Sequence, residues 1–96
     1  MEKEVIVKWK IEDVHTAKIL GLLQELTVKT RSEKGNIFYN IYQSNDDDNV
    51  LILHECYVTA EAAQFHKDSA HYQEIVVGQI IPYLQVREVS TVKKLY

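Results

Sequence analysis

Apolar and charged residues alternate at the start of the chain. Val5, Val7, Trp9 and Ile11 are separated by single residues, most of them charged. A period of two is typical of a β-strand that buries one face. We therefore expect the chain to begin with a strand.

The next segment changes to helical spacing. Its apolar stripe recurs every three or four residues, as on a helix that buries one side, and consists of Ile19, Leu22, Leu23, Leu26 and Thr30. Glu33-Lys34-Gly35 follows the stripe. Gly35 suits a left-handed helix end, so the pattern predicts that the first helix ends there.

Two strand candidates follow, over residues 36–43 and 50–57. A polar stretch with three successive aspartates separates them and predicts a solvated turn. Alternation places Leu53, Glu55 and Tyr57 on one face of the second candidate and His54 and Cys56 on the other.

A second helix is predicted after Thr59, which can cap it. The i, i+3, i+4 rule places Ala62, Phe65 and His66 on its inner face. Ser69 offers another cap, so we expect the helix to break and restart there. Residues 84–92 then return as a strand.

The predicted order is strand, helix, strand, strand, helix, strand. This is the α+β, ferredoxin-like βαββαβ arrangement with an antiparallel sheet. At 96 residues, the chain has the length of one small domain. We expect a single domain over residues 1–96.

The sheet face opposite the helices is not predicted to be polar. Phe38, Tyr42 and Ile52 fall on it, whereas a half-solvated sheet alternates apolar with polar residues. A large exposed apolar face marks an interaction surface. We predict a homodimer through the sheet face; a monomer with a few exposed apolar residues is the alternative.

Composition excludes several functions. The net charge of −3 and the lack of a long basic cluster argue against nucleic-acid binding. No run approaches the roughly 20 apolar residues of a membrane span, and the N-terminus lacks the apolar core of a signal peptide. Cys56 is the single cysteine, so no intrachain disulfide forms. We expect a cytoplasmic protein that acts on a small molecule.

Two kinds of ionisable residue stand out near the second helix. Glu55 lies within an apolar strand, where a carboxylate is costly unless it is paired or functional. In the functional interpretation, Glu55 is a general base or a carboxylate that orients a histidine. In the structural interpretation, it belongs to a buried ion pair, for example with Arg31 or Arg87. His66 on the inner helix face is a candidate proton relay, or a packed histidine. His71 polarises a substrate oxygen, or caps a helix and fills space.

We expect no metal site. On one continuous helix, His66 and His71 are rotated by about 140° from each other, whereas helical zinc pairs use a spacing of four. Trp9, Tyr39, Tyr57, Tyr72 and Phe65 are predicted to line an aromatic substrate pocket. Aromatic core packing is the alternative for each of them.

An ordered set of short motifs resembles the antibiotic biosynthesis monooxygenase domain over Val5 to Val92. The set is Glu33-x-Gly35, Tyr39, Glu55-x-Tyr57, Phe65-His66 and Ser69-x-His71-Tyr72. The resemblance implies a dimeric α+β barrel and a monooxygenase that needs no cofactor. Its substrate would be a quinol-like or other enolisable aromatic molecule.

Other branches of the same family imply other activities. Phe65-His66-Lys67 followed by His71-Tyr72 is similar to the isomerase that processes a phosphorylated autoinducer, which implies an isomerase or tautomerase with Lys67 and Lys8 near the phosphate. A non-catalytic binding module is the third possibility. The haem-degrading branch has its iron-binding histidine where this chain has Val76, so haem degradation is not expected.

Overall fold

The computed structural model describes residues 1–96 and contains four strands and several short helices. The strands are β1 (Lys3–Ile11), β2 (Asn36–Gln43), β3 (Val50–Tyr57) and β4 (Leu84–Val92). The helical segments are η1 (Asp13–His15), α1 (Thr16–Leu20), α2 (Leu23–Arg31), α3 (Ala60–Asp68), η2 (Tyr72–Ile80) and η3 (Ile81–Tyr83).

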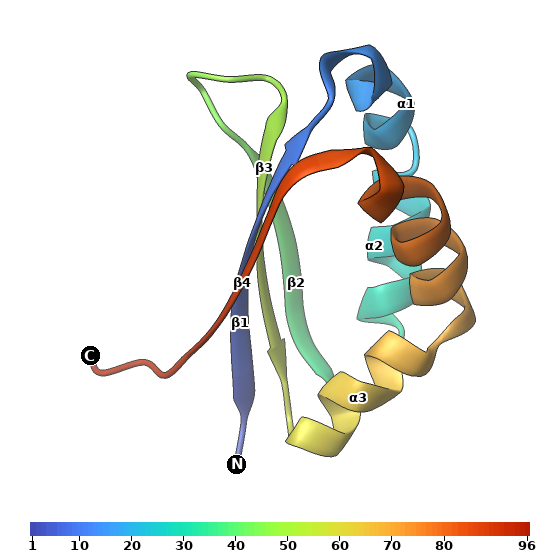
Figure 1. Cartoon of the computed structure of the whole chain (residues 1–96). Helices are drawn as coiled ribbons and strands as arrows, with labels where there is room; N and C mark the ends of the chain where they lie inside the picture. The colour runs from blue at the N-terminus through green and yellow to red at the C-terminus, as the bar shows by residue number, and fades with distance from the viewer.

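The strands form one antiparallel sheet in the order β2-β3-β1-β4. All helices pack on one face of this sheet, and the other face is open (Figure 1). The predicted α+β, ferredoxin-like fold is therefore confirmed. Antiparallel pairing fixes which residues share a face, and it places Val5 of β1, Tyr39 of β2 and Glu55 of β3 in one row on the helical side.

The core fills the space between the sheet and the helices. Its fully buried members include Trp9, Ile19, Leu26 and Leu53, so the predicted strand and helix stripes do face each other. Burial of such side chains contributes roughly 1.5–3 kcal/mol each relative to exposure. This burial fixes the phase of α2 against the sheet.

Both predicted caps around the second helix are present. The Thr59 side chain accepts a hydrogen bond from Ala62 N at 3.1 Å at the start of α3. The helix ends at Asp68, and Ser69 Oγ then accepts from Tyr72 N at 3.3 Å. The chain therefore changes direction between α3 and η2, as the serine predicted.

The segment after this break is a π-helix. In η2 the turns are wider than in an α-helix, and Ile81 N donates to Val76 O five residues earlier. Ile75, Val76 and Ile80 are buried on its inner side. π-helical turns are rare and often occur at functional sites, and this one borders the cavity described below.

The expectation that Gly35 is a left-handed cap is wrong, because no glycine has a positive φ. Gly35 is required by close packing instead. A Cβ added to it would lie 2.3 Å from Ala62 Cβ, and Gly35 O accepts from Val58 N at 2.8 Å. The end of the first helical region is thereby held against the start of α3.

The open sheet face is mixed rather than apolar throughout. Its half-exposed apolar residues include Phe38, Ile52 and Tyr42 as predicted, while Lys8 of β1 lies opposite Glu88 of β4 on the same face. The prediction of a second face with large apolar side chains is confirmed for β2 and β3, and β1 adds Ile6, which is 38% exposed opposite His54. The sheet-to-sheet dimer stays a prediction.

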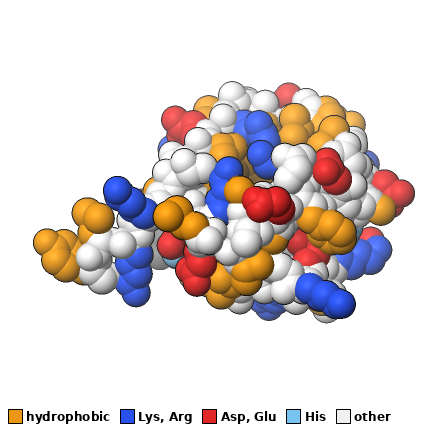
Figure 2. All heavy atoms as spheres, turned by 90° about the horizontal axis from the view of Figure 1, so that it is seen from below, with side chains coloured by type: hydrophobic (Ala, Val, Ile, Leu, Met, Phe, Trp, Pro, Cys, Tyr) orange, Lys and Arg blue, Asp and Glu red, His pale blue; other side chains and the backbone are white.

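The residues after Val92 form a tail that projects away from the body of the molecule (Figure 2).

None of the helices has the length and apolar character that crossing a membrane requires.

Candidate active site

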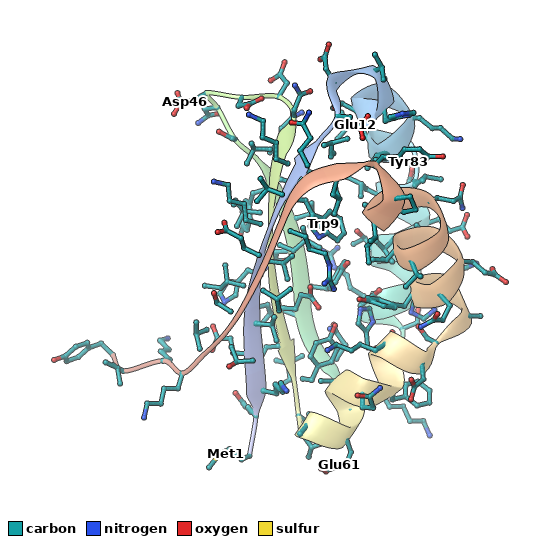
Figure 3. All side chains as sticks on the ribbon, viewed as in Figure 1. Met1, Trp9, Glu12, Asp46, Glu61 and Tyr83 are labelled. Carbon is teal, nitrogen blue, oxygen red and sulfur yellow. The ribbon has the colours of Figure 1, made fainter.

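A cavity of about 250 Å³ lies between the helical face of the sheet and the segments α3 and η2. Its wall includes four of the five aromatic residues that the sequence suggested for a pocket: Trp9, Tyr39, Tyr57 and Tyr72. Trp9 extends from β1 into the space between sheet and helices (Figure 3). The cavity is small and mostly apolar, with a few polar groups, as ligand sites commonly are.

Phe65 is the exception. Its side chain is 65% exposed and is not part of the cavity wall. The expectation that it shares the inner face of the helix with His66 is wrong, because Ala63 takes that place and is buried. Ala63 and His66 are three residues apart, so this stripe also obeys helical spacing.

His66 is buried beside the cavity. Its side chain is 5% exposed, and its ring packs 5.3 Å from that of Tyr57 and 5.1 Å from that of Tyr72. Its Nδ1 lies 2.8 Å from Glu33 Oε2, a hydrogen bond between two buried groups. The ring is therefore held in one orientation by packing and by a carboxylate.

His71 reaches the same carboxylate oxygen. Its Nε2 lies 2.6 Å from Glu33 Oε2. The expected rotation of about 140° between His66 and His71 does not apply, because it assumed one continuous helix, and α3 ends at Asp68 with the chain turning at Ser69. His71 does not line the cavity, so its placement supports a role through Glu33 rather than contact with a substrate.

The shared carboxylate constrains the proton positions. An ionised carboxylate only accepts hydrogen bonds, so we assign the donors at these two contacts as His66 Nδ1–H and His71 Nε2–H. In a neutral imidazole the other nitrogen then carries a lone pair. For His66 this is Nε2, which lies 3.9 Å from Oε1 of the cavity-lining Glu55. The basic atom of His66 is therefore on the cavity side.

Glu55 forms the other polar part of the cavity wall. Burial raises the pKa of its carboxyl above the ordinary value, and the hydrogen bond from Tyr57 acts in the opposite direction. Tyr57 OH donates to Glu55 Oε1 at 2.7 Å. No salt bridge joins Glu55 to Arg31 or Arg87; Arg31 instead donates to Tyr39 O at 2.9 Å. The proposed arginine ion pair is therefore absent.

The pKa values of the two most buried tyrosines, Tyr39 and Tyr57, are strongly raised. Burial raises the pKa of Tyr39 and of Tyr57, and the negative charge of Glu55 acts in the same direction. Both phenols consequently remain protonated at any physiological pH. They act as hydrogen-bond donors or packing surfaces, not as bases.

Glu33, His66 and His71 each bring one possible metal ligand atom within 4.8 Å of the others. Two of these separations, 2.8 and 2.6 Å, are hydrogen-bond lengths. Ligands around a tetrahedral zinc ion stand about 3.3 Å apart, given bonds of about 2.0–2.1 Å. The geometry is that of a hydrogen-bonded triad, and the absence of a metal site stays a prediction.

Sequence reasoning did not assign a role to Glu33. Its side chain is 4% exposed and joins both histidines, and its Oε1 is buried without a hydrogen-bond partner. In the sequence it stands between Ser32 and Lys34, where a glutamate is ordinarily solvated. Only its place in the family motif distinguished it.

Comparison with known proteins gives a consistent result. The family model described as "Antibiotic biosynthesis monooxygenase" matches residues 4–77. "Putative monooxygenase YcnE" of Bacillus subtilis is 27% identical over 67 residues, which are 70% of this chain and 70% of that protein.

Solved structures agree with the sequence matches. The "Putative antibiotic biosynthesis monooxygenase from Nitrosomonas europaea" has a TM-score of 0.90 and 25% identity, covering 99% of this chain and 91% of that one. The protein Rv0793 from Mycobacterium tuberculosis has a TM-score of 0.90 and 26% identity, covering 100% and 97%. These structures share the whole fold, cavity-forming elements included.

Proposed function

Because the chain belongs to the antibiotic biosynthesis monooxygenase family, we propose that it is a cofactor-independent monooxygenase. Its substrate is a quinol-like or other enolisable aromatic molecule bound in the cavity beside His66. One observation carries the proposal: His66 Nδ1 lies 2.8 Å from Glu33 Oε2, while its Nε2 is on the cavity side, 3.9 Å from Glu55 Oε1. A positioned imidazole is the commonest general base in enzymes.

The first step is proton abstraction. A substrate O–H, or a C–H next to a carbonyl, loses its proton to His66 Nε2. The imidazolium that forms is stabilised by Glu33 on one side and by the nearby Glu55 on the other. Proton transfer of this kind contributes about 10²–10⁴-fold to a rate.

The second step uses the electrons of the substrate anion. For a ring methylene the balance is R₂CH₂ + O₂ → R₂C=O + H₂O: two C–H bonds break, one oxygen atom forms the carbonyl, and the other leaves as water. The substrate carbon is oxidised by four electrons and O₂ is reduced by four. The protein supplies a dry aromatic cavity and the proton relay, since the substrate itself is the reductant.

Cavity polarity supports an aromatic oxygenated ligand. Trp9, Tyr39 and Tyr72 offer ring surfaces for packing. Glu55, with its raised pKa, and its hydrogen-bonded partner Tyr57 offer polar atoms on the same wall. A flat molecule with one oxygen near His66 satisfies both kinds of contact.

Oxygen consumption tests this function. Anthrone is a suitable probe, since it has one acidic methylene between two rings. We expect the purified protein, stripped of metals with a chelator, to consume one O₂ per anthrone converted to anthraquinone. A rate no higher than that of the heat-denatured protein, for anthrone and for quinols alike, contradicts the proposal.

An isomerase or tautomerase is the second candidate, favoured by the basic groups beside the cavity. Lys67 lines the cavity, as a phosphorylated substrate would need, whereas Lys8 lies on the open sheet face and is excluded from that role. The same His66 relay would move a proton without oxygen. Deuterium exchange into an enolisable ketone, measured by NMR under nitrogen, separates this reaction from oxygenation.

A binding module without turnover is the third candidate. A purely apolar cavity would favour it. The imidazole and carboxylate in the wall, only 3.9 Å apart, favour an enzyme instead, because burying two ionisable groups without a function is costly.

We further propose that two copies pair through their open sheet faces. Phe38, Ile52 and Tyr42 support this arrangement, since they leave apolar surface on β2 and β3 that no helix of the chain covers. His54, on the same face, has its Nε2 2.5 Å from Glu4 Oε2, so its imidazole already has a hydrogen-bond partner within the chain.

A further inference from the structure

One residue of the cavity wall carries a buried donor without a partner. Trp9 is 3% exposed and lines the cavity, and its Nε1–H forms no hydrogen bond within the chain. Leaving a buried donor unpaired is destabilising. Such groups in native proteins call for an explanation, and an acceptor atom on a bound molecule is one.

A guanidinium lies next to this indole. Arg87 of β4 is the register partner of Trp9 of β1, and both side chains line the cavity. Side chains directly opposite in an antiparallel pair are neighbours. Arg87 Nη2 also lies 3.5 Å from the hydroxyl of Tyr72, whose ring packs against His66. The pair therefore stands at one end of the cavity, with Tyr72 between it and the imidazole.

The charges around the cavity are unlike those of the whole protein. The chain has a net charge of −3, yet the cavity is lined by Lys3, Lys67 and Arg87 against one carboxylate, that of Glu55. None of the three cations forms a salt bridge within the chain. Basic side chains are visible near the middle of the surface at the end of the molecule where α3 lies (Figure 2).

We propose that the molecule bound in the cavity carries an anionic group, a carboxylate or a phosphate, held by Arg87 and the Trp9 indole N–H. This inference rests on the proposed function of the same cavity and defines its substrate class. Arginine suits such a group because its planar fork donates two hydrogen bonds to two oxygens. Lys3 and Lys67, elsewhere on the wall, add positive potential that attracts an anion into the cavity.

The register also fixes where the anion lies relative to the chemistry. Glu55 is opposite Val5 on β1, four residues from Trp9, which is about 13 Å along the strand. The anionic group is therefore at the opposite end of the ligand from the atoms that meet His66 and Glu55. The long Arg87 side chain covers part of the roughly 13 Å between the two ends of the cavity. A two-ring aromatic skeleton with its acidic group at one edge is long enough for the remainder.

Binding of three naphthalene probes, measured by calorimetry at pH 7, tests the inference without any turnover. They are neutral 1-naphthol, 5-hydroxy-1-naphthoate, which carries a carboxylate at the opposite end from its hydroxyl, and the monophosphate of 1,5-dihydroxynaphthalene, which carries a phosphate there. We expect at least one anion to bind about 10–100-fold more tightly than 1-naphthol, as expected for charged hydrogen bonds. Which anion binds more tightly distinguishes a carboxylate substrate from a phosphate one.

Two variants locate the anchor. In Arg87→Met, the preference for the anion should fall to about twofold or less, while the Kd of 1-naphthol stays the same. Trp9→Phe keeps a ring but lacks the N–H, and should lower the preference by about fivefold. Lys18→Met is the matched control, since it removes one positive charge from the exposed side of α1 and should preserve the preference.

Several results overturn the inference: equal affinity of the wild-type protein for all three probes, no binding of any probe, or an unchanged preference in Arg87→Met. An equal loss of all three probes in Arg87→Met also overturns it, because the arginine would then be structural. If the protein prefers the anionic probes but shows neither oxygen consumption nor proton exchange, only the proposed activity is contradicted. Failure of the anion site and failure of the proposed activity are therefore distinguishable.

Discussion

Glu33 Oε2 lies 2.8 Å from His66 Nδ1, although the two residues are 33 positions apart in the chain. This contact favours one tautomer of the imidazole and holds the ring in one direction, with Nε2 on the cavity side. A carboxylate that orients a histidine is a common device of enzymes that use histidine as a base. The predictions below begin with this pair.

His66→Ala should lower turnover by about 100-fold or more, because it removes the proposed base. Oxygen-uptake kinetics with anthrone measure this, and far-ultraviolet circular dichroism checks that the variant folds. Glu61→Ala, an exposed change on the same helix, is the control. Full activity of the alanine variant would exclude a catalytic role for this imidazole.

Glu33→Gln should lower kcat by about tenfold or more while leaving probe affinity unchanged, because Glu33 orients His66 and does not line the cavity. Ring ¹⁵N NMR of His66 provides a second readout: the Nδ1–H tautomer should dominate in the wild-type protein and share the population with Nε2–H in the variant. Glu25→Gln, on the exposed side of α2, should change neither. Identical histidine spectra would contradict the positioning role.

Glu55→Gln tests the raised pKa of this carboxyl. Because burial raises the pKa in the folded state above the ordinary 4.5, the folded protein binds more protons than the unfolded one in that window. The stability of the wild-type protein should therefore fall as pH rises from about 4.5 through the folded pKa, by at most about 1.4 kcal/mol per pH unit. The glutamine variant lacks this loss and keeps an acceptor for Tyr57.

Urea unfolding between pH 4 and pH 8, at one protein concentration, measures the difference in free energy of unfolding. The advantage of Glu55→Gln over wild type should grow with pH and then level off. Glu61→Gln, an exposed change, should give a curve parallel to wild type. If the Glu55→Gln curve is also parallel, the carboxyl is not destabilised by burial.

Ile52→Asp or Phe38→Asp should convert a dimer into monomers, because each places a charge within the apolar part of the open sheet face. Light scattering after size-exclusion chromatography gives the mass directly. Val28→Asp, on the exposed side of α2, should leave the mass unchanged. A wild-type protein that is monomeric, or variants that remain dimeric, would rule out this interface.

Gly35→Ala should destabilise the fold by about 1–3 kcal/mol through overpacking, since the new Cβ would stand 2.3 Å from that of Ala62. The double variant Gly35→Ala, Ala62→Gly should recover part of the loss. Gly78→Ala, whose Cβ meets only Gln73 O at 3.4 Å, should not destabilise. Thermal unfolding distinguishes these outcomes, and a neutral Gly35→Ala would show that α3 shifts freely.

Strand alternation and helical stripes were sufficient for the fold. Val5, Val7 and Trp9 face the helices because a period of two leaves a strand only one apolar side. Thr59 and Ser69 marked helix boundaries because their hydroxyls satisfy backbone N–H groups that a helix start leaves unpaired. These signals are local, so the sequence contains them in full.

The sequence did not determine which side of α3 faces the sheet. Phe65 was expected inside because it is large and apolar, but the small Ala63 is buried and Phe65 is exposed. Both choices keep His66 inward and both obey helical spacing. The rotation of α3 depends on contacts between segments distant in sequence, such as that of Ala62 with Gly35.

The sequence by itself determined the order of strands and helical regions along the chain, the break at Ser69 and the candidacy of His66 and Glu55, because each depends on periodicity, on a capping residue or on a polar residue in an apolar run. Only the tertiary structure decided that Glu33 joins both histidines. The turn at Ser69 brings His71 back toward the end of the first helical region, and such a meeting depends on how separate elements pack. Contacts of this kind arise from the three-dimensional arrangement of side chains, which no local pattern encodes.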